Sequence, residues 1–187
     1  MLTTKQTYRL RRMTPPDIQA VVTLDRRVFS DPWPESSYVQ ELYYNLQAHY
    51  FVLHKAGPWR IQPRLKVEAL LGFVGGRVEP HNNEGHISTL AVVPELRGQG
   101  LGEYLLLAEL HALLDAGAQS LMLEVRVSNR VAQALYSKYG FEVYTTMHRY
   151  YADGEDAYLM RLDPPPLVLF QQLLTDRCKA LARDFRF

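Results

Sequence analysis

The chain has 187 residues, of which 47% are hydrophobic and 22% charged, and its formal net charge is +1. This composition is too apolar for a disordered chain, and without a long run of Lys or Arg it argues against an extended nucleic-acid surface. The single cysteine, Cys178, excludes an internal disulfide and favours a reducing compartment. We find no signal-peptide core and no apolar segment of membrane length. We therefore expect a cytoplasmic protein with neither a nucleic-acid nor a membrane partner.

The first part of the chain predicts a strand, two helices and two further strands. Thr14 suits an N-cap, prolines follow it, and apolar residues then recur at helical spacing. The stretch SDPWPE (30–35) breaks this helix before a second one. In chain order the expected elements are a strand at 7–13, helices at 14–29 and 36–47, and strands at 50–56 and 68–79, with a turn-like segment at 57–66 between the last two.

The next part predicts strands that alternate with helices. In chain order we expect a strand at 85–93, a helix from a glycine-rich turn to about residue 116, a strand at 120–127, a helix at 129–140, and strands at 141–151 and 157–162 joined by a turn at 153–156. This order of elements predicts the α/β class, with a mixed central sheet flanked by helices.

A proline-led extension follows the sheet region. We expect one domain at 7–163, ended by the prolines at 164–166, and an extra helix within 164–187. Apolar residues recur there at nearly helical spacing, namely Leu169, Leu173, Leu174, Cys178, Leu181 and Phe185. The extra helix is expected to pack on its own domain, and docking to a partner is the alternative.

The glycine-rich turn, RGQGLG (97–102), lies between an expected strand and an expected helix, where an anion can approach the backbone. A dinucleotide fingerprint would need glycine where Glu103 stands, although Glu124 lies about 20 residues on, as a ribose-binding acid would. A nucleoside triphosphate loop would need Lys-Ser or Lys-Thr after Gly102. The remaining pattern, R-x-x-G-x-G, also fits a plain strand-to-helix turn.

Several stretches together resemble the GNAT superfamily of N-acetyltransferases, most closely the ribosomal-protein-alanine N-acetyltransferases (RimI-like). They are FSDPWPESSYVQEL, ISTLAVVPELRGQGLGEYLL and LEVRVSNRVAQALYSKYGFE. GHISTLAV and RYYADGEDAYLM also resemble the catalytic subunits of eukaryotic N-terminal acetyltransferase A. The resemblance covers about Tyr8 to Leu162, leaves the tail outside, and implies the GNAT fold.

The resemblance implies that the anion at the turn is the pyrophosphate of acetyl-CoA, held by bare N–H groups and the positive end of the helix. Pantetheine would pair with the preceding strand's backbone. Arg97 would contact phosphate or remain a solvated turn residue, and Asn129 would cap its helix and also contact CoA. The expected cofactor-binding residues are Leu90, Ala91, Val92, Arg97, Gly98, Gln99, Gly100, Leu101, Gly102, Glu103 and Asn129.

Two residues are the expected catalytic pair. An unpaired Glu124 in an apolar strand would be costly, so it either pairs with Arg126 or another arginine, or acts as the general base that the resemblance implies. Tyr136 is either a core tyrosine or, by resemblance, the general acid that protonates the CoA thiolate. His86, in the neighbouring strand, is either structural or shares a water relay with Glu124.

By resemblance, two segments form a groove for the substrate. Pro32 and Trp33 would cover one side of the substrate site, and Tyr150 and Tyr151 the other. The alternatives are a hydrophobic plug for Trp33 and a strand-edge pair for the tyrosines. The histidines show no metal-ligand spacing, so no metal is expected.

The sequence thus predicts an enzyme that transfers acetyl from acetyl-CoA to a protein N-terminal amine, with a ribosomal protein beginning with Ala or Ser as substrate. Acetylation of a lysine or a small-molecule amine is the alternative within this class. A non-catalytic CoA sensor with the tail helix as its output, or a dinucleotide-dependent dehydrogenase, would be alternatives from other classes.

Overall fold

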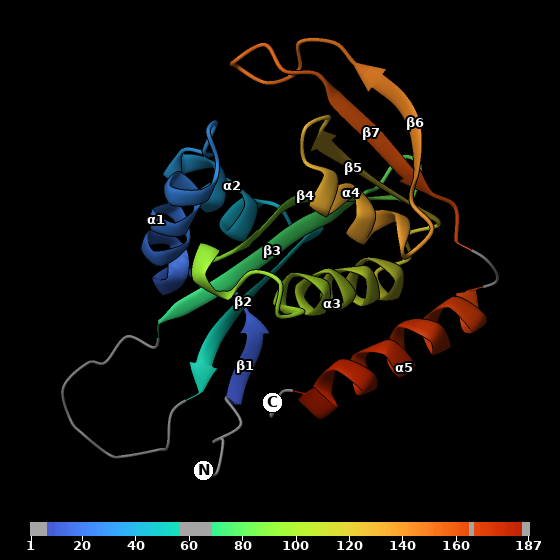
Figure 1. Ribbon diagram of the computed structural model, residues 1–187, viewed down its shortest axis with the longest axis horizontal. Helices are drawn as coiled ribbons and strands as arrows, with labels where there is room; N and C mark the ends of the chain where they lie inside the picture. Colours follow the sequence, from blue (N-terminus) through green and yellow to red (C-terminus); the bar gives the residue numbers. More distant parts are fainter. Residues whose placement is uncertain (1–6, 57–68, 165–166, 185–187) are drawn as a thin grey trace.

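The structure is a computed structural model that describes residues 7–56, 69–164 and 167–184. The turn-like segment expected at 57–66, the first residue of the strand expected at 68–79, and Phe185 of the expected tail helix lie outside these ranges. The described residues form one mixed sheet covered by helices (Figure 1). This architecture confirms the predicted α/β class.

The sheet has seven strands in the order β1-β2-β3-β4-β5-β7-β6. They are β1 (Thr7–Arg12), β2 (Ala48–Ala56), β3 (Leu70–Glu79), β4 (Glu84–Val92), β5 (Ser120–Arg126), β6 (Glu142–Met147) and β7 (Ala157–Leu162). Only β4 and β5 pair in parallel, and every other neighbouring pair is antiparallel. The parallel pair therefore stands near the middle of the sheet, where helix α3 makes the crossover between them.

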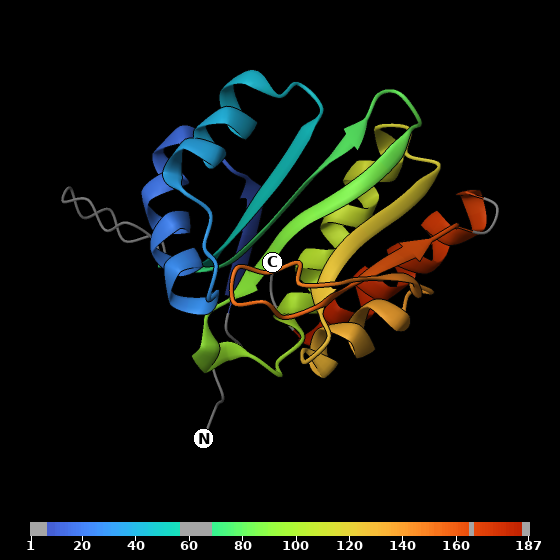
Figure 2. The same cartoon turned by 90° about the horizontal axis from the view of Figure 1, so that it is seen from above.

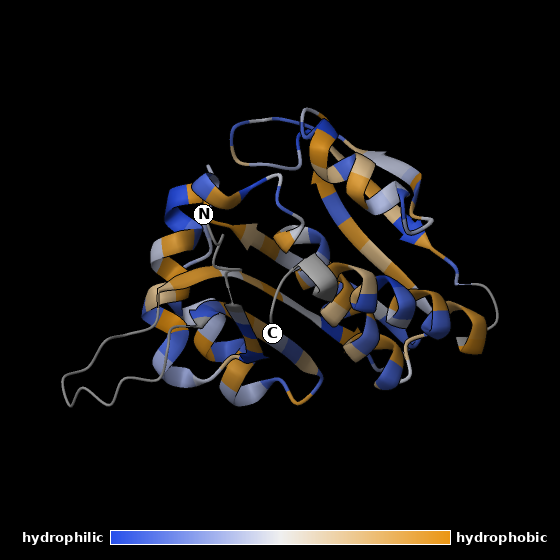
Figure 3. Cartoon of the chain, turned by 60° about the horizontal axis from the view of Figure 1, so that its bottom comes forward, coloured by the Kyte–Doolittle hydropathy of each residue, from blue (hydrophilic) through white to orange (hydrophobic). Residues whose placement is uncertain are grey.

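Helices cover both faces of the sheet (Figure 2). They are α1 (Ile18–Val28), α2 (Glu35–Tyr44), α3 (Leu101–Asp115), α4 (Arg130–Ser137) and α5 (Leu167–Asp184), with short 3₁₀ turns at Pro15–Asp17 and Pro94–Leu96. One apolar cluster joins α1 and α2 to the sheet, and a larger cluster joins α3, α4 and α5 to the opposite face. Hydrophilic and hydrophobic residues alternate along these helices, as the hydropathy colouring shows (Figure 3).

Helix α5 packs against α3 of its own domain. Phe170 and Leu174 are buried in the same apolar cluster as the inner face of α3. Gln171 Nε2 also donates a hydrogen bond to Asp115 Oδ1 at 3.1 Å. Apolar side chains remain exposed on the other side of α5, among them Leu169 and Leu173. The buried side of the extra helix faces α3, whereas Leu169 and Leu173, which the sequence pattern grouped with Leu174, lie on its exposed side.

The order of elements agrees with the sequence prediction, but one strand was predicted too long. The strand expected at 141–151 ends at Met147, and a loop follows up to β7. Two features stop the strand: Arg149 has a left-handed φ of 51°, and its N–H donates to Asp156 Oδ1 at 2.7 Å instead of joining the ladder. Tyr150 and Tyr151 therefore lie on a loop, and the strand-edge interpretation of this pair was wrong.

Among the described helices, none has the length and apolar character needed to cross a membrane.

Candidate active site

Strands β4 and β5 form the centre of the candidate site because they separate part-way along their length (Figure 2). Their pairing covers only residues 84–87 of β4 and 120–123 of β5. A bulge marks the start of the separation: Ile87 and Thr89 pair with consecutive residues of β3, so Ser88 has no partner of its own. Beyond the bulge, each strand has one edge that the other no longer covers.

Glu124 lies where the two strands begin to separate, and it contacts His86. Glu124 Oε2 is 2.8 Å from His86 Nε2, and Ser88 Oγ is 3.3 Å from His86 Nδ1. Both Glu124 and His86 side chains are about one fifth exposed, so solvent and substrate can reach them. The predicted alternative, a pair with Arg126, was wrong, because Arg126 binds other carboxylates. Glu124 is thus held by a histidine, as a proton acceptor in a half-buried site would be.

Tyr136 is buried in the larger apolar cluster at the end of α4, where its ring centroid lies 6.0 Å from that of Phe141. Burial, together with the nearby Tyr151, raises the pKa of Tyr136 to about 12. The phenol therefore keeps its proton at neutral pH. Tyr136 is thus a core tyrosine, as one of its interpretations predicted, and its role as the general acid stays a prediction.

The glycine-rich turn has the backbone conformation that the sequence predicted. Gly98 and Gly100 have φ angles of 73° and 83°, in the left-handed region that favours glycine. Gly100 is the N-cap of α3. Among the described residues, no backbone N–H from Gly98 to Glu103 has a hydrogen-bond acceptor. Free N–H groups at the positive end of a helix are the arrangement that binds phosphate.

The free edge of β4 offers further backbone groups beside this turn. Ala91 is at a hydrogen-bonded position opposite β3, because Val93 N, two residues later, donates to a β3 carbonyl at 2.8 Å. Leu90 and Val92 therefore turn their backbone groups toward the edge that β5 has left. Arg97 Nε donates to the Val92 carbonyl at 3.3 Å. Of the strand residues expected to bind the cofactor, Ala91 differs, since its backbone bonds lie within the sheet.

One wall of the expected substrate site is the loop between α1 and α2, which carries Pro32 and Trp33. Asp25, buried in α1, accepts hydrogen bonds from Trp33 N at 2.7 Å and Tyr38 Oη at 2.8 Å. The Trp33 ring is half-buried and packs against Tyr38, with 5.6 Å between ring centroids. Trp33 thus plugs the space between the two helices, as one of its interpretations predicted. Its role toward substrate stays a prediction.

The opposite wall is the loop between β6 and β7, which carries Tyr150 and Tyr151. Their rings meet edge to face, with centroids 5.1 Å apart. Burial and the negative charge of Glu124 raise the pKa of Tyr150. Burial is also the main cause that raises the pKa of Tyr151 to about 12, with Glu124 among the smaller ones. Both neutral phenols therefore lie near the carboxylate, and Tyr151 also lies near Tyr136.

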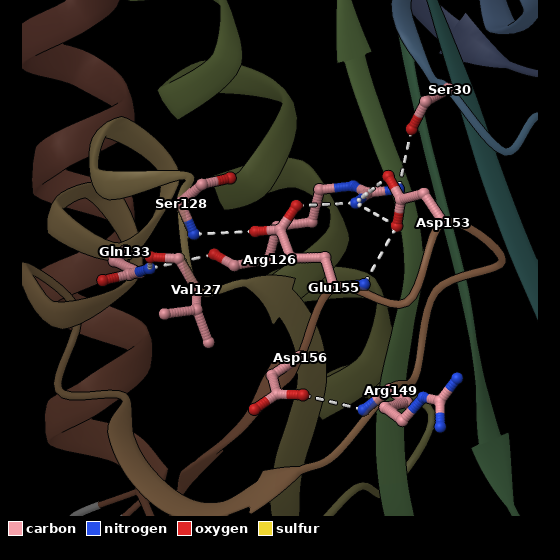
Figure 4. Close-up of polar contacts among 9 residues, drawn as sticks. All are labelled: Ser30, Arg126, Val127, Ser128, Gln133, Arg149, Asp153, Glu155 and Asp156. Carbon is pink, nitrogen blue, oxygen red and sulfur yellow. Dashed lines mark hydrogen bonds and ion pairs between the residues drawn. The ribbon is translucent and has the colours of Figure 1, made fainter.

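Arg126 joins the two walls, and we did not predict this role from the sequence (Figure 4). Its guanidinium donates to Ser30 Oγ, at the end of α1, at 2.7 Å. It also donates to Asp153 and Glu155 of the opposite loop at 2.8 and 2.7 Å. Its carbon Cζ lies 3.8 Å from the centroid of the Tyr151 ring. The sequence does contain a signal for this role, namely charge. Arg126 is two residues from Glu124 and so lies on the same face of β5, and an acidic segment at 153–156 follows later in the chain.

Asn129 has the expected capping role. Its Oδ1 accepts a hydrogen bond from Ala132 N at 3.2 Å, at the start of α4. Beside it, Gln133 Nε2 donates to the carbonyls of Arg126 and Val127 at 2.9 and 3.0 Å (Figure 4). These bonds fix the strand-to-helix connection between Glu124 and Tyr136. Within the ranges that the structure describes, no group of His, Cys, Asp and Glu side chains is arranged to hold a metal.

A turn with free N–H groups, an open strand edge, a carboxylate paired with a histidine and a buried phenol are together typical of an enzyme that moves a group from an anionic carrier to a second substrate. Comparison with known proteins identifies the group. Residues 18–141, more than half of the chain, match the acetyltransferase (GNAT) family. The chain belongs to this family and is an N-acetyltransferase, as its sequence motifs predicted.

Its relatives include several N-terminal acetyltransferases. An N-alpha-acetyltransferase of Sulfurisphaera tokodaii is 34% identical over 157 residues, 82% of this chain and 91% of the relative. The N-alpha-acetyltransferase RimI of Mycobacterium tuberculosis is 35% identical over 159 residues, 81% of this chain and 89% of the relative. The crystal structure of the ribosomal-protein-S18-alanine N-acetyltransferase from Escherichia coli has a TM-score of 0.70 and 29% identity, over 83% of this chain and 93% of that one. The resemblance to RimI-like enzymes is thereby confirmed.

Proposed function

We propose that the protein transfers the acetyl group of acetyl-CoA to the α-amine of a protein N-terminus, and that its substrate is a ribosomal protein beginning with Ala or Ser. The observation that carries the proposal is the Glu124–His86 pair, at the point where β4 and β5 separate. The names of the relatives, N-alpha-acetyltransferases and a ribosomal-protein-S18-alanine N-acetyltransferase, support the substrate class. We place the reaction in the cytoplasm, with neither a nucleic-acid nor a membrane partner.

The residues present fit acetyl-CoA. The N–H groups from Gly98 to Glu103, free of acceptors among the described residues, suit a diphosphate, and Gln99 and Leu101 belong to this run. The free edge at Leu90 and Val92 suits the amides of a pantetheine arm. When bound, acetyl-CoA supplies the thioester.

The chain's own groups move the protons. Glu124 accepts a proton from the amine, directly or through water, while the nitrogen of the amine forms a bond to the acetyl carbon. As the carbon–sulfur bond breaks, Tyr136 gives its phenolic proton to the sulfur, since a pKa of about 12 keeps that proton available. Backbone N–H groups of β4 stabilise the negative charge that develops on the acetyl oxygen. One proton thus leaves the amine and one joins the thiol.

Substituting valine for Gly102 tests the cofactor site. A Cβ at Gly102 would lie 3.8 Å from Val92 and 3.9 Å from Leu90, an ordinary contact, so the fold tolerates it. The branched side chain would stand beside the free N–H groups and keep phosphate away. We expect the Kd for CoA in calorimetry to rise roughly tenfold or more, which is about 1.4 kcal/mol, with an unchanged melting curve. Unchanged CoA affinity in the folded variant would remove the turn from the site.

The choice of an α-amine follows from its acidity and from the groove. An α-amine has a pKa of about 8 and is partly free at neutral pH, whereas a lysine amine, with a pKa of about 10.4, is almost wholly protonated. Arg126 bridges the loop of Trp33 to the loop of Tyr150 and Tyr151, so the walls stand close together. A chain end enters such a groove more easily than an internal segment does.

Peptide acetylation tests the proposed function directly. The protein is incubated with acetyl-CoA and peptides that begin with Ala, Ser or a large residue, each with an internal lysine, and mass spectrometry locates the acetyl group. We expect acetylation of the α-amine of the Ala and Ser peptides and none of the same peptides with a blocked N-terminus. Acetyl groups found on lysine, with the α-amine untouched, would support the lysine-acetylating alternative instead. CoA binding without transfer to any amine would support a sensor.

A further inference from the structure

The tail helix α5 reaches the first turn of α3, beside the anion-binding turn. Arg177, near the middle of α5, donates from Nε to Glu103 Oε1 at 2.9 Å. Phe170 and Leu174, buried on the same helix, hold α5 against α3. Glu103 is the third residue of α3, and its backbone N–H belongs to the group without acceptors among the described residues. A side chain from outside the family-matched region, that of Arg177, thus contacts the residue that follows the glycine-rich turn.

The Glu103 carboxylate is surrounded by donors. The same oxygen, Oε1, accepts from Lys138 Nζ at 2.6 Å and from Tyr139 Oη at 2.5 Å, besides Arg177. Burial by itself raises the pKa of Glu103, but the hydrogen bonds from these three side chains outweigh burial and lower it. The carboxylate is therefore ionised at neutral pH.

An ionised carboxylate is an unfavourable neighbour for a phosphate. Both are negative, and they would share the first turn of one helix, where the free N–H groups lie. In the structure, two cations, Lys138 and Arg177, form ion pairs with the Glu103 carboxylate, which carries a single negative charge. The cluster therefore removes the repulsion that this side chain would otherwise exert at the turn.

We propose that Arg177 is a positioning residue for the CoA moiety, which acts by holding and neutralising the Glu103 carboxylate. This inference rests on the proposed function, because acetyl-CoA is the anion in question. Helix α5 then has a second role besides covering α3, because it influences the affinity of the glycine-rich turn for CoA. Lys138 shares the task from the end of α4.

The test compares variants of the full-length chain by calorimetry with CoA and by acetyl-transfer kinetics. Arg177→Gln is expected to raise the Kd for CoA and the KM for acetyl-CoA roughly two- to fivefold, the range of a partly exposed ion pair, with kcat at saturating acetyl-CoA retained. Arg177→Lys keeps the charge and is expected to recover most of the affinity. Lys179→Gln removes an exposed cation from the same helix and serves as the matched control without effect.

A double variant distinguishes the positioning role from a merely structural one. In a Glu103→Gln background no carboxylate remains to be neutralised, so adding Arg177→Gln is expected to change the Kd no further. Unchanged CoA affinity in a folded Arg177→Gln protein, or an equal loss in both backgrounds, would overturn the inference. Failure of the unaltered protein to bind CoA would instead overturn the proposed function. Arg177 is 43% exposed, so its loss leaves no cavity, and melting curves verify folding.

Discussion

Glu124→Gln is expected to lower kcat/KM for N-terminal peptides about 100-fold, within the range that general acid–base catalysis contributes. The amide keeps the size of the side chain and can still contact His86, but it cannot accept a proton from the amine. The loss should be greatest at low pH, because an α-amine with a pKa of about 8 is then mostly protonated and the base is needed most. Initial rates between pH 6 and 9 measure the effect.

Glu142→Gln is a matched control for this variant, because Glu142 is an exposed glutamate of β6, a strand that β7 separates from β5. It should retain full activity. Turnover within a few-fold of normal in a folded Glu124→Gln protein would mean that Glu124 is not the base, and His86→Gln would then be the variant to examine, given the 2.8 Å contact between the two side chains.

Tyr136→Phe is expected to lower kcat about 100-fold at every pH from 6 to 9. The change removes only the hydroxyl and keeps the ring that packs against Phe141, so the melting temperature should stay within a few degrees. Stopped-flow or steady-state rates with saturating substrates measure the loss. Tyr144→Phe, at an exposed position of β6, is the control and should be silent.

The pH dependence of activity is a second test of the role of Tyr136. Its pKa is raised to about 12, so the proton-donating form is fully present below that value and is lost only as the pH rises through it. Ionisation of Tyr136 therefore cannot produce a fall in activity between pH 8 and 10. A fall in that interval that disappears in Tyr136→Phe would contradict the raised pKa, although it would still identify Tyr136 as the group that titrates.

The fold could be predicted from periodicity, because most strands and helices bury one face and expose the other. The failure at 148–151 has a local cause that hydrophobic patterns do not report. YTTMHRYY is rich in β-formers, yet positive φ angles at Arg149 and Gly154 and the bonds of Asp156 to the backbone turn the chain there. Side-chain-to-backbone bonds of this kind compete with the strand ladder.

The site could be predicted in its residue types and only in part in its pairings: His86 was one expected neighbour of Glu124, and Arg126 was the other. Glu124, Tyr136 and the glycine turn stand in recognisable motifs, whereas the partner of Glu124 depends on how strands register. Arg126 was the nearest candidate in sequence, but acidic groups of a distant loop bind it instead. Proximity along one strand face therefore gave the wrong partner, and the neighbouring strand supplied His86.

Glu109 shows another limit of sequence reading. In the run LLLAELHALL its charge suggests an exposed position on α3, but the side chain is completely buried. Among the described residues neither of its carboxyl oxygens has a hydrogen-bond donor, and burial raises its pKa well above the ordinary value. Helix α3 has apolar residues on every side. Its hydrophobic periodicity therefore does not indicate which face stays exposed after the sheet and α5 have packed against it.

The bridge made by Arg126 joins the two loops of the proposed substrate site, so we expect this site to be pre-organised. One guanidinium holds Ser30 on one side and Asp153 with Glu155 on the other, so both loops are in place before a peptide arrives. An incoming chain end then loses only its own freedom, because the entropy of ordering the loops was already spent in folding. We therefore expect selectivity at the proposed site to come from the fit of the first residues to a fixed shape, without a closing motion of the enzyme.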